Sequence, residues 1–302
     1  MSLLLLALGF TAGLLMRRTK LNHPLAPDLI NGTIINFALP AMILLRVPAL
    51  DLTPEALTPV FLAWGVIATT ALMVWTLSRR LQWSREVTGA LLLVVPLSNS
   101  AYLGLPLISA IASDEIVGYA ILYDQIGNFM AVAIYASVVI ALLSRQAETP
   151  TVGSVVRRIV LFPPFLVTVL ALLIRPDMLP GWAIGPLTLL GATMGPLAML
   201  IVGLQLEWAL PAALRQPLAI GASIKLVGAP LIATAAAMLI GSASAAGQAS
   251  VLQAAMPSMI TAGLLGIAAG FSRTLIVAMI GLTTLASALS LPLVFWRVLG
   301  SF

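Results

Sequence analysis

The sequence contains no cysteine and one histidine, and only 8% of its 302 residues are charged. The lack of cysteine excludes a disulfide framework, a thiol nucleophile and a cysteine-ligated metal site. The one histidine, His23, lies between apolar segments, and the chain has no HExxH motif, so zinc hydrolysis and serine–histidine chemistry both lack their parts. These absences argue against an enzyme, and we expect no catalytic residue, metal or organic cofactor.

Hydrophobic residues make up 61% of the chain, and the mean hydropathy is +1.10. This composition excludes an ordinary soluble protein and predicts an all-α polytopic membrane protein surrounded by lipid. The net charge of +5 comes from short basic clusters between apolar segments. Because the clusters form no continuous patch, they indicate membrane topology and not a nucleic-acid partner.

Ten apolar segments are candidate membrane spans. Their expected bounds are Leu3–Met16, Leu29–Leu45, Leu57–Leu77, Val87–Ala112, Ile116–Leu143, Ile159–Ile174, Trp182–Trp208, Leu218–Ile240, Val251–Phe271 and Thr274–Val298. The first and sixth are short for a hydrocarbon core about 30 Å thick, which needs roughly 20 helical residues. The first lacks a basic n-region and an A-x-A cleavage site, so we expect it to remain as a span and not to be removed as a signal peptide.

The cations are distributed unequally between alternate loops. One side holds Arg17, Arg18, Lys20, Arg79, Arg80, Arg85, Arg145, Arg157, Arg158, Arg215 and Arg273. The other side holds only Arg46, Arg175 and Arg297, while Lys225 lies within a span. By the positive-inside rule the richer side faces the cytoplasm, which places both termini outside it.

With this orientation the first five spans start outside and the last five start inside. Residues 1–144 and 145–302 would therefore be two five-helix units related by inversion, an arrangement found in many transporters. ALPAMILL at residues 38–45 resembles MGPLAMLIV at residues 194–202, which supports the repeat. The sequence thus predicts ten transmembrane helices as a 5+5 inverted repeat.

The fourth span is interrupted by PLSNSAYLGLP at residues 96–106. Pro96 and Pro106 cannot donate a backbone hydrogen bond, and Ser98, Asn99 and Ser100 suit a helix start better than a helix interior. Lipid offers no partner for freed backbone groups, so a break at this depth is tolerated only beside protein or a polar cavity. We therefore expect a helix break near Ser98.

The ninth span, fourth of the second half, is interrupted by QAAMPSMITAGL at residues 253–264. Pro257 frees the carbonyl of Gln253, and Ser258 could cap the helix that resumes. Paired interrupted spans are the best sequence pointer to a transporter's binding site. The alternative is that the prolines merely kink packed helices. This interpretation is the weaker one, because breaks with cap-type neighbours occur at matching places in both halves.

The predicted breaks define a candidate anion site. About ten helical residues, or roughly 15 Å, carry the fourth span from Val87 to the middle of the bilayer. Inversion would bring two half-helix N-termini together there, and their free N–H groups favour a carboxylate. The expected substrate-binding residues are Asn99, Ser100, Pro257 and Ser258.

Two ionisable residues lie inside the predicted spans. Asp124, with Asn128 one turn later on the same face, could bind a proton or a sodium ion, or could be a structural partner for backbone freed at the breaks. Lys225 could lie near the same site, or its side chain could snorkel to the cytoplasmic surface and meet Glu207. We expect Asp124, Asn128 and Lys225 to form a coupling group, and the sequence leaves these alternatives open.

Five stretches, in this order along the chain, resemble the auxin efflux carrier family, which includes plant auxin carriers and bacterial permeases for small organic acids. They are NFALPAMILL at Asn36–Leu45, SNSAYLGLPLI at Ser98–Ile108, IKLVGAPL at Ile224–Leu231, QAAMPS at Gln253–Ser258 and LTTLASALSLPL at Leu282–Leu293. The resemblance covers nearly the whole chain.

The resemblance implies a ten-helix fold in which the fourth and ninth helices cross. It also implies a scaffold of spans one, two, six and seven, a moving transport domain formed by the other spans, and a homodimer through the scaffold. By motif match, Asn99 is the polar residue of the first break and Pro257 the proline of the second. Ser98 stands where the plant pattern has a proline, and the long cytoplasmic loop of the plant carriers is absent, which favours a bacterial-type permease of the inner membrane.

The function expected from these features is a secondary transporter or facilitator that moves a small organic anion, a mono- or dicarboxylate, by alternating access. The same architecture suits a sodium/proton antiporter or a sodium-coupled symporter with Asp124 as its ion site. Antiporters of similar fold often use adjacent paired aspartates, whereas here Asp124 stands alone within the spans. That difference lowers this alternative and leaves it open.

Overall fold

The computed structural model describes residues 3–17, 19, 25–50, 53–144, 151–175, 178–207, 212–241 and 244–299. Within these ranges the regular elements are all helical, and the one extended pairing is an isolated bridge. Among the same residues six helices are long and apolar enough to cross a membrane, and a bent helix pair, counted as one span, makes a seventh. The predicted polytopic helical membrane protein is therefore confirmed. His23, Trp208 and both chain ends lie outside the described residues.

The six long helices include several joined segments. They are α2–η1–α3–η2 (Ala26–Ala49), η3–α4 (Pro54–Arg80), α7–η5–α8 (Asp114–Leu143), α11 (Gly181–Gln205), η7–α12–η8–α13 (Ala212–Leu239) and α16 (Arg273–Leu299). The remaining apolar helices are shorter or interrupted. They are α1 (Leu3–Met16), α5 (Arg85–Val94), η4 (Ser100–Gly104), α6 (Leu105–Ile111), α9 (Val152–Val160), α10 (Pro163–Ala171), α14 (Ala245–Ala254) and α15 (Ile260–Ala268).

Four segments within or beside the long helices are π-helical. They are η1 (Ile34–Ala38), η4 (Ser100–Gly104), η5 (Tyr123–Phe129) and η8 (Ile224–Gly228). Three of them run directly into a residue–proline pair, at Pro40, Pro106 and Pro230. Proline cannot donate to the preceding turn, and the wider π turn accommodates the missing bond. The prediction that Pro106 breaks the helix is therefore wrong, because α6 follows η4 without interruption.

The sixth predicted span differs from the structure at its start. The sequence places that start at Ile159, but α9 begins at Val152, and the chain bends by 63° between α9 and α10. Phe162 is extended (ψ 112°) and precedes Pro163 and Pro164, which open α10. A residue before proline disfavours the helical conformation, and proline fits the first helical position, so this sequence fixes the bend.

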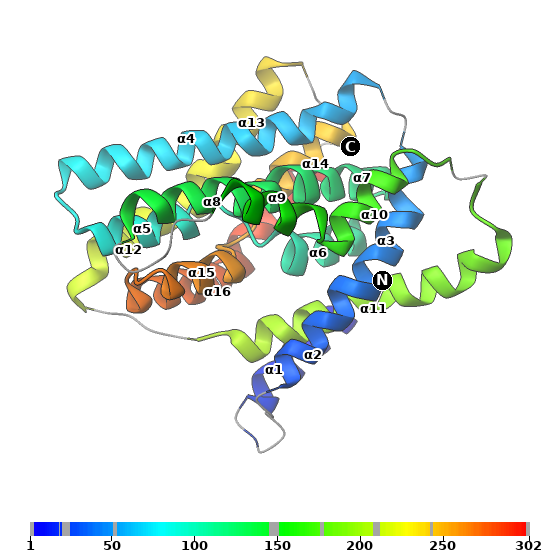
Figure 1. Cartoon of the computed structure of the whole chain (residues 1–302), viewed down its shortest axis with the longest axis horizontal. Coiled ribbons are helices and arrows are strands. Elements are labelled where there is room, and N and C mark those ends of the chain that lie inside the picture. Colours follow the sequence, from blue (N-terminus) through cyan, green and yellow to red (C-terminus); the bar gives the residue numbers. More distant parts are fainter. Residues whose placement is uncertain are drawn as a thin grey trace.

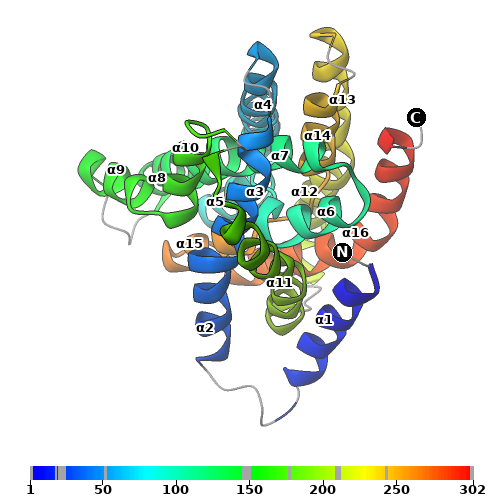
Figure 2. The ribbon, with the colours of Figure 1, turned by 90° about the vertical axis from the view of Figure 1, so that its right-hand side faces the viewer.

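Figures 1 and 2 show α1 lying along α11 at one end of the molecule, while α4 and α13 run side by side at the other. The close approach of α1 to α11 depends on small residues. A side chain added at Gly13 would overlap the carbonyl oxygen of Leu200, and one at Gly203 would overlap the carbonyl oxygen of Phe10. Small residues four apart, Gly9 and Gly13, let backbones pack closely within lipid. Helices α3 and α10 pack against each other, and α3 also packs against α11.

Two large apolar cores share the broken segments. One core joins residues of α1, α3, α6, α7, α11 and α14, and the other joins residues of α4, α5, α8, α12, α15 and α16. Each broken segment thus gives one half to each core: α6 and α14 to the first, α5 and α15 to the second. The breaks themselves lie where the two cores meet.

Candidate functional site

The two breaks pair with each other through their backbones. Helix α5 ends at Val94 and α14 ends at Ala254, and Ser98 and Ser258 form an antiparallel bridge between the segments that follow. The Asn99 N–H donates to the Pro257 carbonyl at 2.8 Å, and the Met259 N–H donates to the Leu97 carbonyl at 3.1 Å. Each break therefore satisfies backbone groups that the other leaves free, as a bilayer interior requires.

A tyrosine satisfies one carbonyl freed by proline. Pro96 cannot donate to the carbonyl of Leu92, four residues earlier. The hydroxyl of Tyr135, from α8 (Met130–Leu143), donates to that carbonyl at 2.6 Å. Tyr135 was not identified from the sequence, although an aromatic hydroxyl one span away from a proline-freed carbonyl is a natural partner.

Asn128 holds the backbone of the first break. The Ser98 N–H donates to Asn128 Oδ1 at 3.3 Å, and Asn128 Nδ2 donates to the Ser98 carbonyl and, at 2.7 Å, to Ser100 Oγ. One amide side chain thus supplies both the acceptor and the donor that the break needs. The backbone-partner role that the sequence left open for Asp124 belongs instead to Asn128.

Asp124 is buried and bound by neutral groups. Its side chain is 3% exposed, and its carboxylate accepts hydrogen bonds from Ser100 Oγ and, at 2.7 Å, from Gln125 Nε2. No described lysine or arginine lies within ion-pair distance of the Asp124 carboxylate. The ion pair found among the described residues joins Arg46 to Asp114. A buried carboxylate without a cation is costly and is usually functional within a membrane.

Lys225 also serves the first break. It lies in η8, is fully buried, and its ammonium donates to Ser98 Oγ at 2.6 Å. The alternative in which this side chain snorkels toward Glu207 is therefore wrong. Lys225 and Asp124 bind different serines of the same short segment, Ser98 and Ser100.

The second break has fewer polar contacts. The Ser258 N–H donates to Thr283 Oγ1 at 3.1 Å, and Gln253 Nε2 turns away from the break to the Ala120 carbonyl at 3.0 Å. The residue before α15 is Met259, so the expectation that Ser258 caps that helix is wrong. Thr283, which the sequence did not single out, has the role at the second break that Asn128 has at the first.

Several buried polar atoms at the two breaks have no hydrogen-bond partner. Among the described residues these include Asn99 Nδ2, Ser258 Oγ, Gln125 Oε1 and Gln253 Oε1. Asn99 precedes η4, is 2% exposed and makes no capping bond. Buried polar groups are almost always satisfied, so unpartnered donors and acceptors at one place require an explanation such as a ligand.

A pocket of about 290 Å³ adjoins both breaks. Its lining includes Ala101 and Tyr102, which follow the first break, Met259 and Thr261, which belong to the second, and Asp124. On the far side it is lined by residues of α2, η1, α3 and the α9–α10 bend, namely Asn31, Ile34, Ile35, Leu39, Arg158 and Phe162. The pocket therefore lies between these helices and the two breaks.

Two contacts bracket this pocket. The hydroxyl of Tyr102 donates to Asn31 Oδ1, and the rings of Phe129 and Phe162 stack with centroids 4.0 Å apart. A larger hollow of about 420 Å³ has a mainly apolar lining from α1, α6, α11 and α16. Because Asp124 and Gln125 line the smaller pocket and not this hollow, we take the smaller pocket as the candidate site.

The structure brings together most of the residues that the sequence predicted. Asn99, Ser100 and Ser258 lie at the two breaks, while Asp124, Asn128 and Lys225 are joined to them by the hydrogen bonds above. Pro96 and Pro257 lie within the breaks, and Pro106 lies beyond the first one. The roles of these residues in binding and coupling stay predictions.

Comparison with known proteins gives the family. A model of the family described as "Membrane transport protein" matches residues 2–295. A protein of Methanothermobacter thermautotrophicus, named "Uncharacterized transporter", is 28% identical over 279 residues, covering 89% of this chain and 87% of that protein. The chain therefore belongs to the membrane transport protein family, that of the auxin efflux carriers.

Proposed function

We propose that the protein is a secondary transporter or facilitator that carries a small organic anion, a mono- or dicarboxylate, by alternating access. The observation that carries the proposal is the pair of unpartnered polar groups, Asn99 Nδ2 and Ser258 Oγ, where two broken helices meet. One comes from each break. The 290 Å³ pocket is lined by Ala101 and Met259, which are close to them in sequence, while Asn99 and Ser258 are not part of its lining.

The chemistry of the breaks favours an anion. Helical structure resumes at Ser100 and at Ile260, so two helix N-termini point into this region, and each carries about half a positive charge. The amide of Asn99 offers N–H donors, and the hydroxyl of Ser258 can donate as well. A carboxylate bound here would satisfy groups that the protein leaves unsatisfied.

A coupling ion is the second candidate function, with the sodium/proton antiporter and the sodium-coupled symporter as its forms. The observation that favours it is Asp124, a buried carboxylate bound by neutral groups, with the unpartnered Gln125 Oε1 beside it. Two acceptors without a cation can hold a sodium ion, and a carboxylate alone can hold a proton. In this proposal Asp124 binds the ion. The movement of that ion is either coupled to the organic substrate, as in a symporter, or is itself the transport, as in an antiporter.

The membrane arrangement belongs to the same proposal. Counting α5–η4–α6 and α14–α15 as broken spans, and α1 and α9–α10 as a short and a bent one, gives ten spans in two halves, 1–144 and 145–302. The scaffold would be α1, α2–α3, α9–α10 and α11, and the close packing of α1 on α11 supports it. We further propose a homodimer through this scaffold, in a bacterial inner membrane, with both termini outside the cytoplasm.

Purified protein in liposomes tests the function. Vesicles are incubated with labelled pyruvate, lactate, succinate or citrate, with and without proton and sodium gradients. Saturable accumulation of an unchanged acid supports the carrier. Ion exchange with no acid uptake would favour the antiporter, and a chemically altered product would point to an enzyme.

A further inference from the structure

The pocket beside the breaks contains one cationic side chain. Arg158 of α9 lines it together with Asp124, and no other described lysine or arginine does so. The ammonium of Lys225 is bonded to Ser98 and lies outside the lining. Most other lining residues are apolar, so an entering anion meets its one full positive charge at Arg158.

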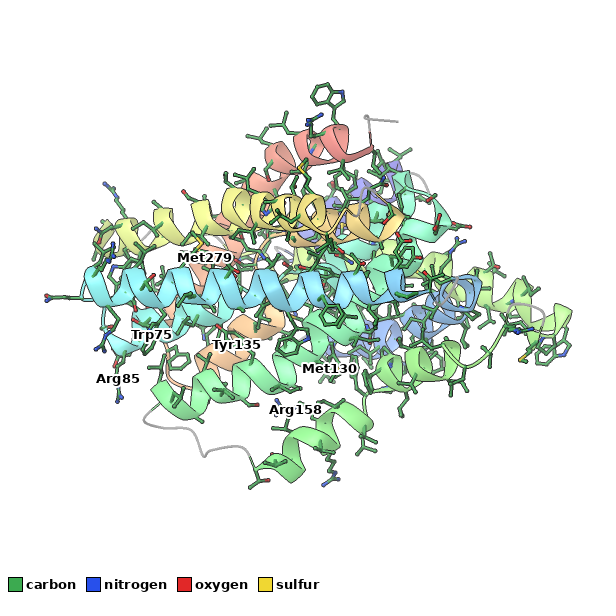
Figure 3. The ribbon with its side chains drawn as sticks, turned by 90° about the horizontal axis from the view of Figure 1, so that it is seen from above. Trp75, Arg85, Met130, Tyr135, Arg158 and Met279 are labelled. Carbon is green, nitrogen blue, oxygen red and sulfur yellow. The ribbon has the colours of Figure 1, made fainter. Side chains whose placement is uncertain are left out.

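The bend between α9 and α10 places Arg158 at this pocket. The Pro163–Pro164 pair turns the chain by 63°, and the ring of Phe162 stacks on Phe129 of η5. Figure 3 shows Arg158 on the side of α9 that faces α8.

The neighbouring arginine is in a different position. Consecutive residues point about 100° apart around a helix. Arg157 shares a shallow surface hollow with Gly153, Ser154 and Arg158, but it does not line the 290 Å³ pocket. Arg157 therefore has the same charge on the same helix without access to the site.

We propose that Arg158 is the residue that admits anions to this pocket and determines its preference for negatively charged molecules. The proposal rests on the proposed function, because it takes the pocket as the route to the breaks. The basic loops assign Arg158 to the cytoplasmic side, so Arg158 acts on molecules that enter from there. A cation in an apolar-walled cleft raises the local concentration of anions and their rate of entry, and salt weakens the effect.

A single introduced cysteine measures this preference without knowledge of the substrate, because the chain has no native cysteine. Thr261 lines the pocket and is exposed, so Thr261→Cys is a conservative probe. Its reaction rates with sulfonatoethyl and trimethylammonioethyl methanethiosulfonate are compared in the full-length protein. With Arg158 present, the sulfonate reagent should react roughly tenfold faster relative to the ammonium reagent than with Arg158→Gln.

Two further variants identify the cause of a change in this ratio. Arg158→Lys should keep the anion preference, and Arg157→Gln should leave it unchanged. An equal ratio in the Arg158→Gln and Arg157→Gln proteins, both with unchanged melting temperature, would overturn the proposal. Raising the salt concentration should shrink the preference only where Arg158 or its lysine replacement is present, and a salt-independent preference would also count against it.

Transport separates this proposal from the proposed function. For an acid that the wild type carries, Arg158→Gln should raise KM from the Arg158 side and leave kcat unchanged. If the wild type carries no acid while the cysteine probe still depends on Arg158, the proposed function fails and the anion-admitting role stands. If acids are carried and the reactivity of the cysteine does not depend on Arg158, the proposed function stands and the anion-admitting role of Arg158 fails.

Discussion

The first break, between α5 and η4, is surrounded by charged and amide side chains, whereas the second, between α14 and α15, is held mainly by one hydroxyl. At the first break, Lys225 and Asn128 bind Ser98, and Asp124 binds Ser100. At the second, Thr283 accepts from the Ser258 N–H. The backbones pair with each other at both breaks, but the ionisable groups of the described residues gather at the first.

This difference separates two tasks. Each break has an unpartnered group that can donate a hydrogen bond, Asn99 Nδ2 at the first and Ser258 Oγ at the second, so substrate binding can use both. The buried charges of Asp124 and Lys225 both act on the first break, so coupling to an ion would use that break alone. If the two halves are related by inversion, the fold repeats and the coupling chemistry does not.

The largest expected effect comes from removing the charge at the first break. Asp124→Asn keeps the size of the side chain and can still bond Ser100 and Gln125, so the protein should fold. Accumulation driven by a proton or sodium gradient should be lost, because the ion has no carboxylate to bind. Uptake is measured against pH and sodium, with the exposed Glu115→Gln as control. An unchanged profile at normal activity would remove Asp124 from the mechanism.

The backbone support of the first break should be the next most sensitive to mutation. Asn128→Ala leaves the buried Ser98 N–H without a partner and removes the amide donor to its carbonyl. We expect a loss of about 2–5 kcal/mol in the free energy of unfolding in mixed micelles. Ser137→Ala, which removes only a hydroxyl bonded within α8, is the control and should cost much less.

Removing the hydrogen-bond support of the second break should lower the free energy of unfolding by less. Thr283→Val preserves shape and leaves one buried N–H, that of Ser258, unpaired, so we expect about 1–3 kcal/mol. The same unfolding titration measures it. A cost equal to that of Asn128→Ala would show that the two breaks are equally supported, which would contradict the expected difference between them.

The smallest effect on stability is expected at Ser258. Its hydroxyl has no partner, so Ser258→Ala should change the free energy of unfolding by no more than about 0.5 kcal/mol. Anion affinity should fall nonetheless, since the hydroxyl is free to bind the substrate. A large loss of stability with unaltered affinity would mean that this hydroxyl is structural.

Local sequence signals predicted where the helices break but not which side chains support the breaks. Pro96 and Pro257, each followed by small polar residues, place the breaks correctly because proline removes a donor whatever surrounds it. The bond between Lys225 and Ser98 joins residues 127 positions apart, and it depends on packing that no local pattern contains. For the same reason, sequence spacing put Asp124 and Asn128 on one face without telling their roles apart.

Some of the missed features did have signals. The pair Pro163–Pro164 after Phe162 predicts a helix start, and it would have divided the sixth span where the structure bends. The residue–proline pairs that directly follow η1, η4 and η8 mark widened turns, and two of these turns carry Ser100 and Lys225. No local signal predicted that Ser258 does not cap α15. Ser258 instead pairs with Ser98 of the first break, which is distant in the sequence.

The most direct test of the account is the affinity of Asn99→Ala for an acid that the wild-type protein accumulates in liposomes. Loss of a buried hydrogen bond to a charged ligand costs about 1.5–3 kcal/mol, so the affinity should fall roughly ten- to a hundredfold. Stability should hardly change, since Asn99 Nδ2 has no partner in the structure. Ala101→Ser, two residues away and itself lining the pocket, should do less. A well-folded Asn99→Ala protein that binds the acid with wild-type affinity would contradict the account.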